Sequence, residues 1–295
     1  MTSIIDSHHH LWDRSVFAQP WIDPDSMARI NHDFGLRELE PLARAAGVSG
    51  TVLVHALPSI DETIHLLEVA AASELIQGVV GWLDLTADVT AQVERLRAGP
   101  GGELLVGIRH LAQAEPDHAH LGRTDLRRGV AALGDNGLVL DLVIHHNQLP
   151  GVVGLAADVP NTRVVLDHLG KPDLDSGRIE EWARDIAELA AVPSVTAKLS
   201  GIVTEADWVH WTTDDLRPAV DHVLSTFGPR RLMFGSDWPV LQLASDYGTW
   251  VATVRQLTAS LDTIERRWLW ADTARRVYRL ECPSSTRSAP DTGPR

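Results

Sequence analysis

Short apolar, β-branched runs alternate with amphipathic stretches along almost the whole chain, and this alternation limits the folds it can adopt. The expected strands cover residues 4–8, 51–55, 79–83, 106–110, 138–144, 164–168, 195–199 and 232–236. Apolar residues recur at helical spacing between them, as at Leu36, Leu39 and Ala43. Strands that alternate with helices in this way indicate a (β/α)8 barrel, with a doubly wound open sheet as the main competitor. We therefore expect an α/β protein with a distorted TIM barrel.

The length and the sequence pattern favour a single domain. The chain has 295 residues, and no break in composition divides it before the C-terminal end. We expect the barrel to occupy residues 1–282. Residues 283–295 are rich in Ser, Thr and Pro and lack apolar periodicity, so we expect a disordered tail there. No G-x-G-x-x-G follows the first expected strand and no P-loop motif occurs, so a nucleotide site has no support.

Charge and cysteine usage exclude several classes of partner. The formal net charge of −14 argues against nucleic acid or an anionic membrane surface. No uncharged apolar run reaches the ~20 residues of a membrane span, and no signal peptide is expected at the N-terminus. Cys282 is the single cysteine, which fits a reducing compartment, so we expect a cytoplasmic protein. The oligomeric state cannot be read from the sequence, and a homo-oligomer stays open.

Histidines stand at the end of the first expected strand, within Ile-Ile-Asp-Ser-His-His-His. Residues i and i+2 of a strand share a face, so His8 and His10 are expected to project together. Two imidazoles in this arrangement form half of a divalent-metal site. A chance cluster of histidines is the alternative for these residues taken alone.

Two further polar residues end later strands, where a barrel gathers its chemistry. His168 and Asp237 each close an apolar run, although a loop or helix cap is the alternative for both. Together with His8 and His10 they form a set of three nitrogens and one oxygen that suits Zn²⁺ or a similar ion, with Mn²⁺ as another candidate. Such an ion activates a water and polarises a carbonyl, so we expect Asp237 to act as general base.

Arg109 ends the fourth expected strand, and we expect it to act in catalysis with Asp237 and His168, because a guanidinium can bind a carboxylate or a developing oxyanion. The expected substrate-binding residues are Arg109, His110, His55, His145, His146, Trp12 and Trp238. Core filling is an equally good interpretation of the two tryptophans. Lys198, inside an expected strand, could bridge a metal or form a Schiff base, and more often such a lysine pairs with a carboxylate.

These residues resemble the amidohydrolase-2 branch of the amidohydrolase superfamily, in particular its sugar-lactonase-like group. That group includes L-fuconolactonase-like, L-rhamnonolactonase-like and 4-sulfomuconolactone hydrolase-like proteins. The matching stretches are IDSHHHLW (5–12), GIRHL (107–111), EPD (115–117), LDHLGKP (166–172), AKLSG (197–201) and FGSDWP (234–239). The resemblance implies a distorted barrel, hydrolysis of a small lactone, metal ligands at His8, His10 and His168, and a catalytic aspartate at Asp237.

The chain departs from the group at positions that concern the substrate. His55 stands where relatives commonly carry Gln, and His145-His146 replaces a stretch that often holds Arg or a bulky residue. Some relatives act without a tightly bound metal, so metal-free catalysis stays open. We expect a metal-dependent hydrolase that opens a small lactone of the sugar or muconolactone type. One alternative is a metal-dependent, non-oxidative decarboxylase of an aromatic or unsaturated acid. The other is a binding domain in which a metal ion only stabilises the fold.

Overall fold

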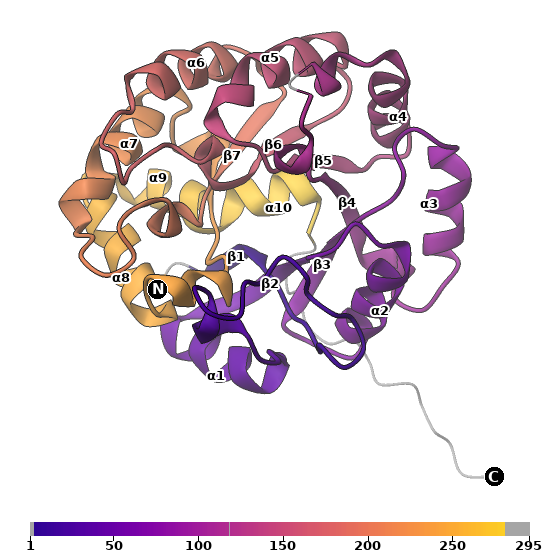
Figure 1. Ribbon diagram of the computed structural model, residues 1–295, viewed down its shortest axis with the longest axis horizontal. Helices are drawn as coiled ribbons and strands as arrows, with labels where there is room; N and C mark the ends of the chain where they lie inside the picture. Colours follow the sequence, from indigo (N-terminus) through magenta and orange to yellow (C-terminus); the bar gives the residue numbers. More distant parts are fainter. Residues whose placement is uncertain (1–2, 118, 281–295) are drawn as a thin grey trace.

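Eight parallel strands form one sheet whose order follows the sequence, as the computed structural model of residues 3–117 and 119–280 shows (Figure 1). The strands are β1 (Ile4–His9), β2 (Val48–Val54), β3 (Ile76–Gly81), β4 (Leu105–His110), β5 (Val139–Leu142), β6 (Val164–Leu166), β7 (Val195–Leu199) and β8 (Leu232–Phe234). Directly after β8, the backbone N–H of Asp237 donates to the carbonyl of His8 at 2.7 Å, and the N–H of His10 donates to the carbonyl of Trp238 at 2.7 Å. These bonds join the first strand to the last, and the expected (β/α)8 barrel is confirmed.

Helices surround the strands in the ring that Figure 1 shows. They are α1 (Leu36–Ala46), α2 (Ile60–Ala71), α3 (Val89–Arg97), α4 (Thr124–Asp135), α5 (Leu149–Asp158), α6 (Glu180–Ala190), α7 (Thr213–Thr226), α8 (Tyr247–Leu257), α9 (Thr263–Arg267) and α10 (Thr273–Tyr278). Their apolar stripes pack on the outer face of the sheet, because the spacing of residues such as Leu39 and Ala43 puts them on one side of the helix. None of the helices within the described residues is long and apolar enough to cross a membrane.

A second, smaller apolar cluster fills the inside of the barrel. Inward residues of the strands, such as Ile5, Val54 and Val165, pack against Val277 and Tyr278 of α10. The C-terminal helix therefore covers the barrel interior at the end where the strands begin. The opposite end, where the strands stop, is left to polar side chains and loops, as in other barrels of this kind.

The observed strands differ from the expected ones mainly at their ends. β6 stops at Leu166 instead of residue 168, because the following turn has left-handed backbone at His168 (φ 52°) and Leu169 (φ 53°). β5 stops at Leu142 instead of residue 144, and β2 begins three residues earlier than expected, at Val48. The boundary of the domain at residue 282 and the tail at 283–295 lie outside the described residues.

Candidate active site

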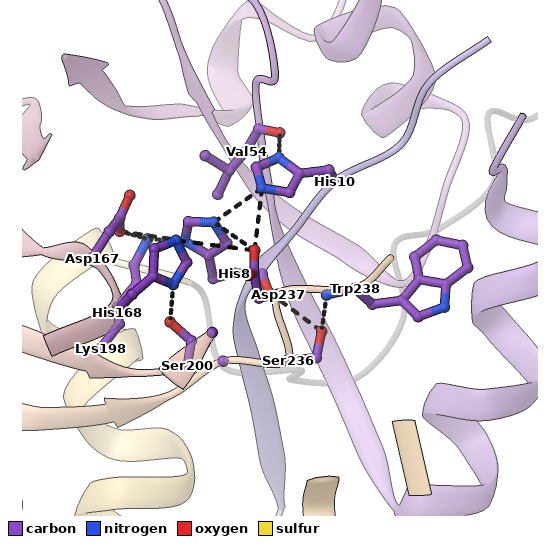
Figure 2. Close-up of polar contacts among 12 residues, drawn as sticks. His8, His10, Val54, Asp167, His168, Lys198, Ser200, Ser236, Asp237 and Trp238 are labelled. Carbon is purple, nitrogen blue, oxygen red and sulfur yellow. Dashed lines mark hydrogen bonds and ion pairs between the residues drawn. The ribbon is translucent and has the colours of Figure 1, made fainter. Parts of the chain in front are cut away.

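Four side chains meet at the end of the barrel where the strands stop (Figure 2). His8 lies in β1, His10 follows it directly, His168 follows β6 and Asp237 follows β8. The Oδ1 atom of Asp237 lies 3.6 Å from His8 Nε2, 3.5 Å from His10 Nε2 and 4.0 Å from His168 Nε2. The structure thus brings together all four residues that the sequence predicts as metal ligands, although they come from three strand ends far apart in the chain.

Hydrogen bonds on the other ring nitrogen turn Nε2 of each histidine toward Asp237. The Nδ1 atom of His10 lies 2.8 Å from the carbonyl oxygen of Val54, an acceptor that requires Nδ1 to carry the proton. Nδ1 of His8 lies 3.0 Å from Lys198 Nζ and 3.3 Å from Asp167 Oδ1, and Nδ1 of His168 lies 3.0 Å from the hydroxyl of Ser200. Nε2 of His10 therefore presents a lone pair to the centre of the cluster, and Nε2 of His8 and of His168 point to the same centre.

The donor set fits a divalent cation. His8 Nε2 and His10 Nε2 lie 3.1 Å apart, a spacing that allows a hydrogen bond between the two rings or the binding of one ion by both. Ligands of a tetrahedral Zn²⁺ with bonds of ~2.0–2.1 Å lie about 3.3 Å from one another, which is close to the separations within the cluster. His8, His168 and Asp237 also form a buried group whose possible ligand atoms all lie within 4.8 Å of each other.

Burial keeps these histidines neutral, which is the form that binds a metal. It lowers the pKa of His10 to about 3 and that of His168 to about 4. It also lowers the pKa of His8 well below the ordinary value. Burial raises the pKa of Asp237, an effect that the nearby His168 partly offsets. A carboxylate with a raised pKa accepts a proton more readily than an ordinary one does, so Asp237 is suited to act as a base.

Left-handed backbone and a close glycine hold His168 and Asp237 in place. Both residues have positive φ angles, 52° and 58°, a conformation that non-glycine residues rarely adopt. Gly201 lies directly beside them, and a Cβ atom on Gly201 would stand 2.3 Å from His168 Nδ1 and 2.9 Å from Asp237 Oδ2. Trp182 Nε1 donates to the carbonyl of Leu169 at 2.7 Å and so anchors the turn that carries His168.

A buried charge cluster supports the site from inside the barrel. Lys198 Nζ in β7 lies 2.6 Å from Asp141 Oδ2 and 3.0 Å from Asp167 Oδ1, and these side chains are fully buried. The hydroxyl of Tyr278 donates to the same Asp141 oxygen at 2.7 Å. Lys198 therefore pairs with carboxylates, the commoner of the roles considered for it. Asp141 and Asp167 were not predicted as site residues. An aspartate inside Val-Leu-Asp-Leu was the available signal, because a carboxylate inside an apolar strand needs a partner.

Arg109 also reaches the site. Its guanidinium lies 3.6 Å from Asp167 Oδ2 and donates to the carbonyl of His55, and its side chain is only 6% exposed. It lines a cavity of about 340 Å³ together with His10, His168 and Asp237. A cavity of this size suits a small ring-shaped molecule, and Arg109 offers donors on its wall.

The other expected substrate-binding residues do not line this cavity. Trp12 and Trp238 are buried, and each packs edge-on against Phe34, with ring centroids 5.5 and 5.2 Å apart. Figure 2 shows the Trp238 ring pointing away from the four clustered side chains. His55 is buried behind the cavity, where its Nε2 lies 3.1 Å from the carbonyl oxygen of Arg109.

The remaining expected histidines lie at the end of β4 and in the segment that follows β5. His110 Nε2 lies 2.8 Å from His120 Nε2, so it faces a loop residue and not the cavity. His145 is exposed, and His146 begins a short helical turn after β5. Their expected contacts with substrate stay predictions.

Several residues that line the cavity were not predicted as site residues. They are Trp21, Gln113, Lys171, Thr204 and Glu205, with Pro20, Leu57, Pro58, Leu111 and Val143 among the apolar ones. All of them belong to loops between strands and helices or to short helical turns in those loops. Loop conformation is not encoded in hydrophobic periodicity, so no pattern in the sequence separates these residues from other loop residues.

The fold is that of a (β/α)8-barrel enzyme, and the four side chains clustered at the ends of its strands could hold a divalent metal. Residues 5–280 match the family model described as Amidohydrolase, and the chain belongs to that family. The match spans nearly the whole described structure, so the barrel and the site lie within it.

The relatives among curated proteins include two lactonases that match this chain over nearly their whole length. An L-fucono-1,5-lactonase of Burkholderia multivorans is 40% identical over 96% of this chain and 98% of its own length. An L-fucono-1,5-lactonase of Burkholderia ambifaria is 36% identical over 98% of this chain and 100% of its own length. Among solved structures, an amidohydrolase from Burkholderia multivorans with bound zinc is 39% identical and superposes with a TM-score of 0.89, covering 95% of this chain and 100% of the other.

Proposed function

We propose that this protein hydrolyses a small lactone, with L-fucono-1,5-lactone or a closely related sugar lactone as its substrate. The observation that carries the proposal is the convergence of three histidine Nε2 atoms and the Asp237 carboxylate beside a cavity. Ester hydrolysis needs a base for water and a positive field for the carbonyl oxygen, and this cluster can supply both. The identity of 40% to an L-fucono-1,5-lactonase over nearly the whole chain supports the substrate.

Asp237 is the base in this mechanism. Its carboxylate takes a proton from the attacking water, and the proton then passes to the ring oxygen that leaves when the lactone opens. The product is the open hydroxy acid, which retains every atom of the lactone and of one water. Because Asp237 is buried and sits at the cavity wall, it can act on a water beside the bound ring without competition from bulk solvent.

His8, His10, His168 and Asp237 would hold the divalent ion that the fit of the donor set indicates. When bound, such an ion polarises an ester carbonyl and lowers the pKa of a water. The zinc in the similar Burkholderia multivorans structure supports Zn²⁺ as the ion. The Arg109 guanidinium on the same wall provides further donors for the carbonyl oxygen as negative charge develops on it.

The direct test is acid release from L-fucono-1,5-lactone, followed with a pH indicator, before and after treatment with a chelator. Turnover that chelation removes and Zn²⁺ or Mn²⁺ restores supports the proposal in full. Turnover that survives complete removal of metal, verified by elemental analysis, supports lactone hydrolysis and rejects a role for the ion in it. Absence of turnover on sugar lactones and on muconolactone rejects the proposal and moves attention to decarboxylation or to binding alone.

A further inference from the structure

A charged pair stands on the cavity wall outside the proposed catalytic cluster. Lys171 Nζ lies 3.5 Å from Glu205 Oε1, and the two side chains are 20% and 24% exposed. Both residues line the cavity that His168 and Asp237 also line. The mechanism proposed above uses neither of them, so their presence at the wall needs another reason.

Backbone hydrogen bonds fix the positions of the two segments that carry the pair. Lys171 continues the left-handed run that begins at His168, with φ at 54°, and its N–H donates to the carbonyl of His168 at 2.9 Å. Glu205 ends the short helix Ile202–Glu205, and its carbonyl accepts a hydrogen bond from Asp175 N–H at 3.1 Å. The loops after β6 and β7 are thereby joined next to the pair, which fixes its place relative to His168.

Charge pairing at the wall indicates a neutral ligand. The two strong cations that line the cavity each face a carboxylate: Arg109 lies 3.6 Å from Asp167, and Lys171 lies 3.5 Å from Glu205. A substrate that carries its own carboxylate would meet Glu205 and Asp237 at the wall without an uncompensated cation among the described lining residues. An ammonium and a carboxylate side by side instead offer donors and acceptors together, which is what adjacent hydroxyl groups require.

Other parts of the cavity wall are apolar. Trp21, Leu57, Pro58 and Leu111 line the same cavity and present apolar surface. A ligand that fits the whole cavity therefore has a hydroxylated edge and a part without polar groups. This combination matches a sugar lactone better than a ring substituted with several acidic groups.

We propose that the Lys171–Glu205 pair binds hydroxyl groups of a neutral, polyhydroxylated lactone and selects it over lactones that carry a carboxylate. The proposal deepens the function proposed above and rests on it. Lys171 donates to one hydroxyl oxygen and Glu205 accepts from a neighbouring hydroxyl. Hydrolysis of the lactone bond itself depends on Asp237 and the residues clustered with it.

The test compares three substrates on the wild type, two variants and one control variant. The substrates are L-fucono-1,5-lactone, δ-valerolactone, which has the same ring without hydroxyls, and muconolactone, which carries a carboxylate. The proteins are the wild type, Lys171→Met and Glu205→Gln. Glu181→Gln is the matched control, because Glu181 pairs with Arg184 at the same distance of 3.5 Å on an exposed surface. Thermal unfolding of every variant checks that it is folded.

We expect each variant to lower kcat/KM for L-fucono-1,5-lactone by about tenfold to a hundredfold, the effect of a lost hydrogen bond to a charged group. The value for δ-valerolactone should change less than threefold. In Glu205→Gln the unpaired Lys171 should raise kcat/KM for muconolactone relative to the sugar lactone. The Glu181→Gln control should leave all three values at the wild-type level.

Equal losses on L-fucono-1,5-lactone and δ-valerolactone would overturn the inference, because they would mean that the pair only tunes Asp237. In that case the lactonase itself would stand. A wild type that opens none of the three lactones would reject the proposed function and the inference with it. If one variant does not fold, the ratio of kcat/KM for L-fucono-1,5-lactone to kcat/KM for δ-valerolactone in the other variant still tests the inference.

Discussion

Asp237 combines two demands that work against each other. A buried carboxylate is costly without partners, and a base must also be free to accept a proton. Its Oδ1 atom faces the three histidine Nε2 atoms at 3.5 to 4.0 Å, so positive charge placed among them stabilises the ionised form. Burial raises the pKa of Asp237, and this effect outweighs the lowering by the charges of His168, Lys171 and Arg109. One residue can therefore serve as ligand and base.

Replacing Asp237 with Asn should separate folding from catalysis. The substitution keeps the size of the side chain and removes its ability to accept a proton, so we expect kcat on L-fucono-1,5-lactone to fall by about a factor of 10² to 10⁴. The variant should stay folded at 25 °C, and its thermal unfolding midpoint should fall by no more than chelation lowers that of the wild type. Asp214→Asn, at a carboxylate that is 86% exposed, is the control and should keep full activity. Wild-type turnover by Asp237→Asn would show that the base lies elsewhere.

His110 is a histidine whose burial affects stability and not the proposed chemistry. Burial, with a smaller contribution from His120, lowers its pKa to about 4. The folded state thus keeps His110 neutral, whereas the unfolded chain protonates it near the ordinary value of 6.5. Its contribution to stability is complete above pH 6.5 and is lost as the pH falls toward 4.

We expect His110→Gln to weaken this pH dependence. Between pH 7 and pH 5, the wild type should lose up to about 2 kcal/mol more unfolding free energy than the variant, since one pKa unit corresponds to about 1.4 kcal/mol. Urea unfolding of both proteins at the two pH values measures the difference. Parallel losses in the two proteins would mean that His110 titrates alike in the folded and unfolded states.

At the scale of secondary-structure elements, the strands can be predicted from the sequence, whereas the turns that follow them cannot. Apolar runs such as Val195–Leu199 predict a buried strand to the residue, because both faces of a barrel strand are covered. The same runs also place His8 and Asp237 at strand ends. The left-handed turn at His168 leaves no trace in the sequence, because non-glycine residues adopt it only under tertiary constraint.

Pairings across distant loops were equally hidden. Nothing in the sequence shows that His110 meets His120, that Lys171 meets Glu205, or that Trp238 turns into the core. Each depends on which loops become neighbours once the barrel closes. The spacing of apolar residues indicates which face of a strand or helix is buried. It carries no information on which loop lies beside that element.

Gly201 offers a test of how the turn after β7 supports the site. An alanine there would place Cβ 2.3 Å from His168 Nδ1, so His168 must move or the turn must shift. We expect Gly201→Ala to lower kcat/KM about a hundredfold, since a displacement of about 1 Å has this effect in other enzymes. Gly177→Ala is the matched control. Gly177 also has positive φ, 68°, but nothing lies within 4 Å of the position that the added methyl group would take.

The two variants share the cost of placing alanine in left-handed backbone, about 1 kcal/mol or more. Their unfolding free energies should therefore both fall, whereas only Gly201→Ala should lose activity. Equal activity in the two variants would mean that the turn yields without disturbing His168.

At the scale of the whole molecule, the site is tied to the far end of the barrel. Tyr278 of α10 contacts Asp141, Asp141 contacts Lys198, and Lys198 lies 3.0 Å from both His8 Nδ1 and Asp167 Oδ1. This chain of contacts crosses the barrel interior and is surrounded by the inner apolar cluster. The barrel thus holds the ligand residues in position through its own packing, independently of an ion.

Metal removal should consequently weaken the protein without unfolding it. An ion at a hundred times its dissociation constant stabilises the folded state by about 2.7 kcal/mol. In a chain of 295 residues that corresponds to a fall in the unfolding midpoint of roughly 4–5 °C on chelation. We expect circular dichroism at 25 °C to keep its native form after chelation, and addition of Zn²⁺ to restore the midpoint. In Asp237→Asn, which lacks the charged ligand, chelation should lower the unfolding midpoint by less than it does in the wild type. Unfolding at 25 °C on chelation alone would contradict this account, because only a domain that depends on metal to fold behaves in that way.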